Sequence, residues 1–191
     1  GLNTEPYFII TKSRTGSNTN WSTYHKSTGN QSRSYLNLTL AASSGESVWN
    51  STSPTSSVFS LGSSGEFNGD MIAYCFAPVE GYSKFGSYTG NGSADGPFVY
   101  TGFRPRWVLI KVTNTTDSWL LYDSARSTYN VVDDFLQPNS SETEATGNSN
   151  ALDFSSNGFK LRGSVGGTNG SGNTYVYAAF AEHPFKTSRA R

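Results

Sequence analysis

The sequence PYFIITK at residues 6–12 has a counterpart in PRWVLIK at residues 105–111, and these two stretches decide the fold. Each begins with proline, continues as a short run of aromatic and branched apolar residues, and ends at a lysine before a polar turn. Runs of this length and composition are typical of strands that are buried on both faces. We therefore expect one central strand to be written twice, with Lys12 and Lys111 marking where each copy emerges into water.

The similarity continues along the chain in a fixed order. Three further pairs of segments recur, namely WSTY at 21–24 with WLLY at 119–122, VFSL at 58–61 with GFKL at 158–161, and MIAYCFA at 71–77 with YVYAAFA at 175–181. Alternating apolar residues in the second pair favour half-buried strands. Self-similarity of this kind indicates two structural units of the same design.

Composition agrees with a chain of strands and turns. Of the 191 residues, 14% are aromatic and 15% are charged, and glycine occurs 20 times. Such a chain is too aromatic to be disordered, and its Asn-Gly and Asp-Gly pairs favour tight turns. We predict an all-β fold, an antiparallel β-sandwich of the jelly-roll or lectin-like type with at most one short helix. It is built from two pseudo-repeats, at residues 1–84 and 85–191, either as one compact module or as two sandwiches in tandem.

Local patterns add detail to this prediction. Residues 131–136 have apolar side chains four apart before Pro138, which predicts a single helical turn. Residues 139–150 are polar and predict an exposed loop. Residues 85–92 and 97–102 are expected to form a hairpin between the repeats. Nothing comparable precedes Pro6, so the opening strands of the first repeat are expected to be missing or to lie upstream in a longer chain.

Several classes of function are disfavoured by the charges and the cysteine content. The net charge is zero, so the charge balance favours neither a nucleic-acid partner nor an anionic membrane surface. Insertion into a membrane is not expected either. The single cysteine, Cys75, lies in an apolar run and is expected to be a buried small residue. His25 and His183 are far apart, so no metal site is expected, and each is interpreted as a surface or strand-end histidine. No cofactor is expected.

Paired carboxylates raise the question of glycan hydrolysis. Asp133 is adjacent to Asp134, and Glu142 and Glu144 lie two apart. A glycosidase needs two carboxyl groups facing each other across a bond, one of them with a raised pKa. Adjacent acids beside a polar loop more often cap or solvate the chain, so we do not expect an enzyme.

Four motifs in fixed order carry a resemblance to a known family. They are GSYTGNG at 86–92, GPFVYTGFRP at 96–105, SNGFKL at 156–161 and AFAEHPF at 179–185. They resemble a family of uncharacterised repeat domains in structural, fibre-like proteins of marine tailed phages. The resemblance covers nearly the whole chain. It implies location in the virion and a sandwich similar in style to concanavalin-like lectins, and it carries no catalytic residues to transfer.

The function expected from this resemblance is that of a phage fibre structural protein that contributes to recognition of host-surface polysaccharide and to adsorption. One alternative is a purely structural capsid or tail decoration protein without a ligand. A weaker alternative is a polysaccharide depolymerase. The expected partners are further copies of the chain, with a trimer as the first guess, other virion proteins and a glycan of the host-cell surface.

Aromatic residues outside the core pattern are the candidates for glycan binding. Trp49 lies beside Asn50, and Tyr129 lies beside Asn130 in the polar excursion of the second repeat. An aromatic face under a sugar ring with an amide beside it is a typical arrangement for binding carbohydrate. Further aromatics on the joining segment are Tyr88 and Tyr100. The alternative interpretation is that these aromatic side chains fill the core or a subunit interface.

Overall fold

The computed structural model describes residues 2–16, 19–44 and 48–184. The strands are β1 (Phe8–Ser13), β2 (Ser22–His25), β3 (Ser32–Tyr35), β4 (Ser43–Ser44), β5 (Met71–Phe76), β6 (Ser83–Thr89), β7 (Phe98–Tyr100), β8 (Pro105–Val112), β9 (Leu120–Asp123), β10 (Asp134–Phe135), β11 (Ala145–Thr146), β12 (Leu152–Ser155), β13 (Gly158–Leu161) and β14 (Thr174–Ala181). Two short 3-10 helices are η1 (Gly65–Phe67) and η2 (Asn148–Asn150). Within the described ranges, no helix is long and apolar enough to cross a membrane.

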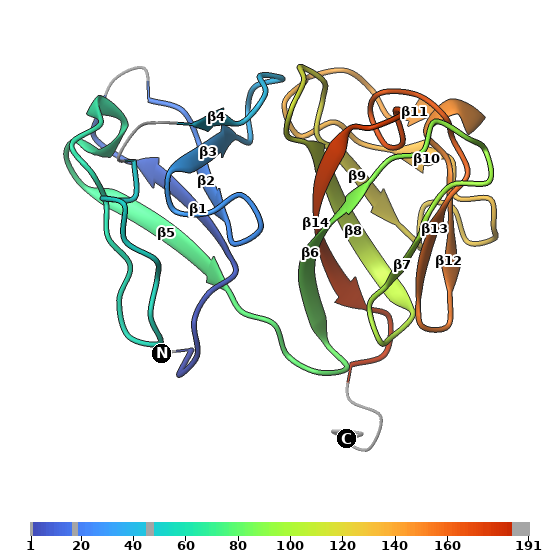
Figure 1. Ribbon diagram of the computed structural model, residues 1–191, viewed down its shortest axis with the longest axis horizontal. Helices are drawn as coiled ribbons and strands as arrows, with labels where there is room; N and C mark the ends of the chain where they lie inside the picture. Colours follow the sequence, from blue (N-terminus) through green and yellow to red (C-terminus); the bar gives the residue numbers. More distant parts are fainter. Residues whose placement is uncertain (1, 17–18, 45–47, 185–191) are drawn as a thin grey trace.

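The strands form antiparallel sheets stacked in layers (Figure 1). The first sheet has the order β4-β3-β2-β1-β5, the second β6-β14-β8-β9 and the third β12-β13-β7, and β10 pairs with β11. We use "first repeat" for β1–β5 and "second repeat" for β6–β14. The predicted fold class is confirmed: the chain is an all-β, antiparallel, sandwich-like assembly of two pseudo-repeats.

The strand register shows that the two repeats correspond residue by residue. The central strand β1 pairs with β2 and β5, and the central strand β8 pairs with β9 and β14. The matching positions are Ile9 opposite Tyr24 and Cys75 in the first sheet, and Val108 opposite Tyr122 and Ala179 in the second. The two buried runs of the sequence therefore occupy equivalent places.

Hydrogen bonds outside the ladders recur as well. In both repeats the lysine at the end of the central strand donates to a carbonyl in the following turn, and an asparagine side chain accepts from a tryptophan N–H. The atom pairs are Lys12 Nζ–Thr19 O (2.7 Å) and Lys111 Nζ–Asp117 O (2.8 Å), and Trp21 N–Asn37 Oδ1 (2.9 Å) and Trp119 N–Asn139 Oδ1 (2.7 Å). These contacts extend the repeat from strands to turns.

The two repeats pack together through equivalent sheet faces. Phe8 of the first sheet lies in one apolar cluster with Leu109 and Ala178 of the second. Hydrogen bonds cross this interface, since Trp119 Nε1 donates to the carbonyl of Tyr35 at 2.8 Å. The two repeats therefore share one apolar interface.

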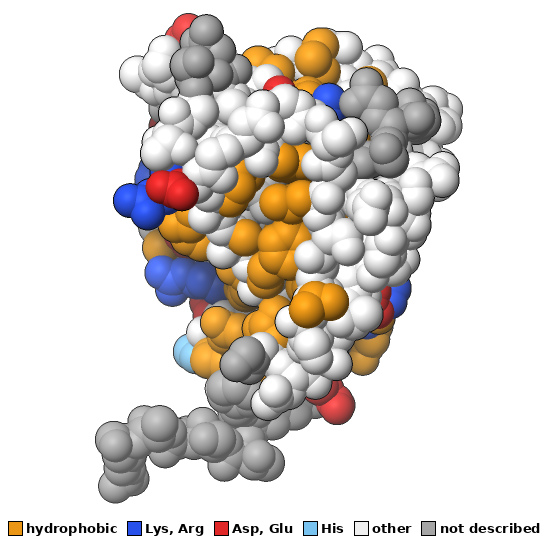
Figure 2. Space-filling view, turned by 90° about the vertical axis from the view of Figure 1, so that its left-hand side faces the viewer, with side chains coloured by type: hydrophobic (Ala, Val, Ile, Leu, Met, Phe, Trp, Pro, Cys, Tyr) orange, Lys and Arg blue, Asp and Glu red, His pale blue; other side chains and the backbone are white. Residues whose placement is uncertain are grey.

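The opposite faces of the two repeats are closed in different ways. The third sheet covers the second repeat, and the resulting cluster holds fully buried side chains such as Phe159 and Leu161. In the described part of the first repeat this face is covered by a loop, residues 48–67, whose Trp49 packs in a smaller cluster with Ile9. Figure 2 shows hydrophobic side chains gathered on this side of the molecule.

Several local predictions are wrong. Residues 58–61 form no strand, although the equivalent 158–161 form β13, because neither a strand like β12 nor one like β7 flanks them in the described chain. The segments around β6 and β7 are not a hairpin, since β6 pairs with β14 and β7 with β13 in another sheet. Residues 131–136 are extended, because the backbone of Val132 pairs with Leu152 and that of Leu136 with Leu121.

Two further expectations meet a mixed outcome. Lys111 does not emerge into water: it is fully buried between the repeats. Its counterpart Lys12 is half-buried. Residues 139–150 are largely exposed, as expected, although they also contain β11 and η2.

Candidate functional site

Trp49 lies in the core of the first repeat. Its side chain is 1% exposed, and its Nε1 donates to the carbonyl of Ser32 at 2.9 Å. The ring packs edge-on against Tyr24, with centroids 5.7 Å apart. Trp49 therefore offers no face to a sugar and fills the core, as in the alternative interpretation. Asn50 beside it is exposed and has a positive φ of 53°.

Trp49 and Tyr129 are not equivalent positions. Gly62 N donates to Val48 O at 2.6 Å, and Arg162 N donates to Ala151 O at 2.8 Å in the second repeat. Because of these matching bonds, Val48 is equivalent to Ala151. Trp49 is therefore equivalent to Leu152, which is also buried.

Tyr129 is the most accessible of the predicted aromatics, with 85% of its surface exposed. Asn130 beside it has a structural role. Its Nδ2 donates to the carbonyl of Phe154 at 3.0 Å, and its Oδ1 accepts from the N–H of the same residue at 2.9 Å. The amide thus ties the Tyr129 loop to β12.

A pocket lies beside this loop at one end of the second repeat. Arg104 Nη1 donates to the same Phe154 carbonyl, at 2.9 Å, so Arg104 and Asn130 meet at one atom. The pocket has a volume of about 420 Å³, and we call it the polar pocket. It is lined by Gly81, Tyr100, Gly102, Phe103, Arg104, Ser156, Asn157 and His183.

The wall of the polar pocket is a tight turn after β7. The N–H groups of Thr101 and Gly102 both donate to the carbonyl of Asn157, at 3.0 and 3.1 Å. Gly102 has a φ of 89°, in the left-handed region that favours glycine. A Cβ at Gly102 would lie 3.6 Å from Tyr100 Oη, so the Tyr100 ring lies over this turn. Tyr100 is still 62% exposed.

An ion pair fixes the cation of the polar pocket. Arg104 Nε lies 2.8 Å from Glu182 Oε2, and the Glu182 N–H donates to the Arg104 carbonyl at 2.9 Å. The guanidinium is therefore held in place before any ligand arrives, which lowers the entropy lost on binding. Together with Tyr100, Asn157 and Ser156, it presents an aromatic ring, an amide, a hydroxyl and a guanidinium paired with Glu182 to one cavity.

One member of each acidic pair noted in the sequence is engaged in other contacts. Hydrogen bonds from Thr146 and Ser127 lower the pKa of Asp134 below its usual value. Glu144 forms an ion pair with Arg126. A general acid of a glycosidase requires the opposite, a raised pKa. Among the residues that the structure describes, no group of three His, Cys, Asp or Glu side chains is placed to hold a metal ion.

Two buried basic groups lie at the contact between the repeats. His25 Nδ1 accepts from the N–H of Ser27, so Nε2 carries the proton and donates to Tyr177 O at 3.1 Å. Burial lowers the pKa of His25 to about 4. The Lys111 ammonium donates to Thr39 O at 3.2 Å as well as to its own turn, and burial lowers its pKa to about 8. His25 is thus at a strand end, as predicted, but inside the protein.

Sequence reasoning found part of this site. The sequence points to Tyr100 as an aromatic of the joining segment and to Tyr129 as an aromatic beside Asn130 in a polar excursion. Arg104 and Asn157 were missed as site residues, although both lie in the quoted motifs GPFVYTGFRP and SNGFKL. In both motifs, turn-forming residues beside an aromatic strand predict a loop. They do not predict which other residues that loop contacts.

The fold and the polar pocket define an all-β repeat module with a ligand-sized cavity at one end. Residues 1–184 match a family described as "Domain of unknown function (DUF7483)", and the chain belongs to that family. No curated protein matches the chain significantly, and neither does any solved structure.

Proposed function

We propose that this protein is a structural module of a phage virion fibre that contributes to recognition of host-surface polysaccharide, and that the polar pocket is the glycan site. The supporting observation is the exposed Tyr100 ring beside the Asn157 amide and the fixed Arg104 guanidinium in one cavity. Aromatic rings stack on sugar faces, and amides and hydroxyls pair with sugar hydroxyls. The guanidinium favours a glycan that carries carboxylate or phosphate groups.

The proposal keeps Tyr129 as a flanking contact and drops Trp49. Tyr129 is on the loop that Asn130 ties to β12, next to the carbonyl that anchors Arg104. Its exposed ring lies near β12, the strand whose Phe154 carbonyl holds Arg104. A second sugar of an extended glycan can contact the ring there. Trp49 is in the core of the other repeat and takes no part.

A binding experiment with matched variants tests this function. Host polysaccharides and a glycan array are probed with the native chain and with Tyr100→Ala, Asn157→Ala and Tyr129→Ala. We expect Tyr100→Ala to weaken binding by about tenfold or more, because loss of one aromatic contact costs about 1–2 kcal/mol. The control is Phe98→Ala, since Phe98 is exposed on the same strand but does not line the pocket. Equal loss with Phe98→Ala, or no glycan binding at all, contradicts the proposal.

A second candidate function is that of a capsid or tail decoration protein without a ligand. The hydrophobic side chains on the outer face of the first repeat favour it, because such surfaces commonly mark contacts with another protein (Figure 2). Absence of cell adsorption together with tight incorporation into particles is the result that selects this alternative.

A further inference from the structure

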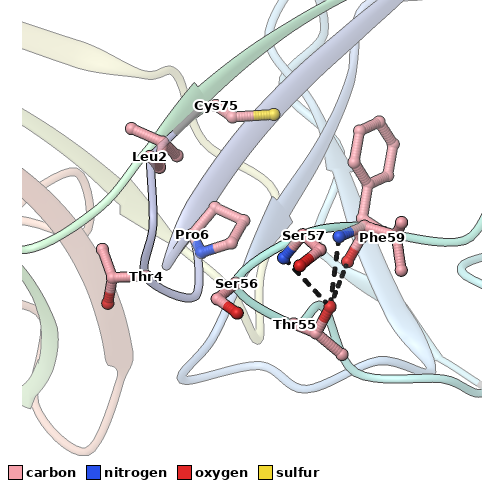
Figure 3. Close-up of a pocket in the computed structure, with 9 residues that line it drawn as sticks. Leu2, Thr4, Pro6, Thr55, Ser56, Ser57, Phe59 and Cys75 are labelled. Carbon is pink, nitrogen blue, oxygen red and sulfur yellow. Dashed lines mark hydrogen bonds between the residues drawn. The ribbon is translucent and has the colours of Figure 1, made fainter.

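A pocket on the outer face of the first repeat marks a place where part of the fold is unfilled. It has a volume of about 260 Å³, and we call it the outer pocket (Figure 3). Leu2 and Thr4 line it from the N-terminal segment, Phe59 from the 55–59 loop, and Cys75 from β5. The described residues that line it are all uncharged, so it suits a neutral occupant.

The second repeat shows what fills this place. Pro6 matches Pro105, so Thr4 matches Phe103, and Cys75 matches Ala179 through the strand register. Phe103 is buried in the core of the second repeat together with Val99 of β7. Val99 lies opposite Phe159, the counterpart of Phe59. The outer pocket therefore lies where β7 and Phe103 close the second repeat.

The edge of β5 is open in the same way. Its counterpart β14 pairs with β6 over seven positions, from Thr174↔Thr89 to Phe180↔Ser83. In the described chain β5 is the last strand of its sheet and pairs only with β1. Tyr74 on β5 is 45% exposed, whereas its counterpart Ala178, which faces Phe85 of β6, is 2% exposed. An open edge with an exposed aromatic is a surface that accepts another strand.

We propose that the first repeat is a docking site for an extended β6–β7 segment supplied by another copy of this repeat. The β6-type strand pairs with the edge of β5 and covers Tyr74. The β7-type strand lies along residues 58–61 and places its central valine in the outer pocket. This mode of recognition uses backbone hydrogen bonds for affinity and alternate side chains for specificity. It does not depend on the proposed glycan site, which lies in the second repeat.

The failure of residues 58–61 to form a strand supports the same conclusion. Their sequence has the alternation of β13, and Phe59 and Leu61 pack on the core beneath them. The equivalent β13 is flanked by β12 and β7, which supply its ladder. A β7-type partner gives residues 58–61 one of the two neighbours that β13 has.

A peptide experiment tests the docking site. The probe is the synthetic peptide SKFGSYTGNGSADGPFVYT, which copies residues 83–101 and contains no cysteine. Cys75 is the single cysteine of the chain and lines the outer pocket, so its reaction rate with a thiol reagent reports occupancy. We expect saturating peptide to slow that reaction by about tenfold or more and to slow hydrogen exchange along β5. The control peptide carries Phe85→Asp and Val99→Asp and should have no effect.

A pocket-filling variant provides the second arm. Thr4→Phe supplies the side chain that the second repeat has at Phe103, so it should protect Cys75 without peptide and reduce the effect of the peptide. Equal protection by the two peptides contradicts the proposal, as does unchanged exchange along β5 with the native peptide. The chain could instead dimerise by pairing two β5 edges. A dimer of this kind that the peptide does not dissociate also contradicts the proposal. Glycan binding is unaffected in every arm.

Discussion

The two repeats have the same three central strands in the same register, and they differ in what closes their outer faces. In the second repeat a third sheet buries the aromatic core completely, and β6 covers the edge of β14. In the first repeat a loop covers the core in part and the edge of β5 is open. The comparison teaches that register and inner-face packing are set by the repeated runs, while closure depends on segments that only one repeat has.

The largest difference is expected for one aromatic residue at equivalent positions. Phe159→Ala should lower the free energy of unfolding by about 3–5 kcal/mol, because Phe159 is fully buried and its loss leaves a cavity. Phe59→Ala should cost about 1–2 kcal/mol, because Phe59 is half-buried beside an existing pocket. Urea unfolding of both variants checks this. Equal losses would mean that the first repeat is as tightly closed as the second.

An acid-dependent loss of stability is expected at the contact between the repeats. His25 has a pKa of about 4 when folded and about 6.5 when unfolded, so the unfolded chain binds the extra proton between these values. The contribution of neutral His25 to the free energy of unfolding is fully present above pH 6.5. The free energy of unfolding falls by up to about 3 kcal/mol as the pH drops toward 4.

Unfolding titrations across that pH range test the effect. His25→Gln should remove this part of the pH dependence. If the native chain and His25→Gln have the same slope, His25 does not link the repeats in its neutral form.

The two equivalent lysines should differ by a smaller amount. Lys111→Ala removes donors from two carbonyls at a fully buried site and should cost about 2 kcal/mol. Lys12→Ala removes a half-buried contact to Thr19 and should cost about 1 kcal/mol or less. Chemical denaturation measures both values. A larger loss at Lys12 would contradict the burial of Lys111 between the repeats.

The smallest effect is expected at the open edge. Tyr74→Thr changes an exposed strand residue and should alter stability by no more than about 0.5 kcal/mol. Ala178→Tyr at the equivalent closed position should cost about 1–3 kcal/mol through overpacking. Thermal or urea unfolding distinguishes the two, and a tolerated Ala178→Tyr would show that β6 does not close that edge tightly.

The sequence predicted the strands that repeat and missed what depends on their neighbours. PYFIITK and PRWVLIK identified the central strands because apolar runs between proline and polar turns have few alternatives. The 58–61 segment has the same pattern as β13 and is not a strand, because pairing depends on a partner that local sequence does not encode. The burial of Trp49 also depends on distant residues. Nothing in its polar sequence surroundings indicates that its loop folds back over Ile9 and Tyr24.

The candidate site was predictable in its aromatics but not in its partners. Tyr100 and Tyr129 were noticed because they lie outside the core pattern. Arg104 and Asn157 are brought to Tyr100 by the turn after β7 and the turn between β12 and β13, which are far apart in the chain. These contacts follow from the third sheet, and nothing in the local sequence indicates that β6 and β7 belong to different sheets.

Residue-resolved hydrogen exchange of β5 and β14 tests the central claim most directly. If the second repeat is closed and the first is open, the amides of β14 exchange only through global unfolding, whereas amides on the free edge of β5 exchange orders of magnitude faster. Equal protection of the two equivalent strands would contradict the account.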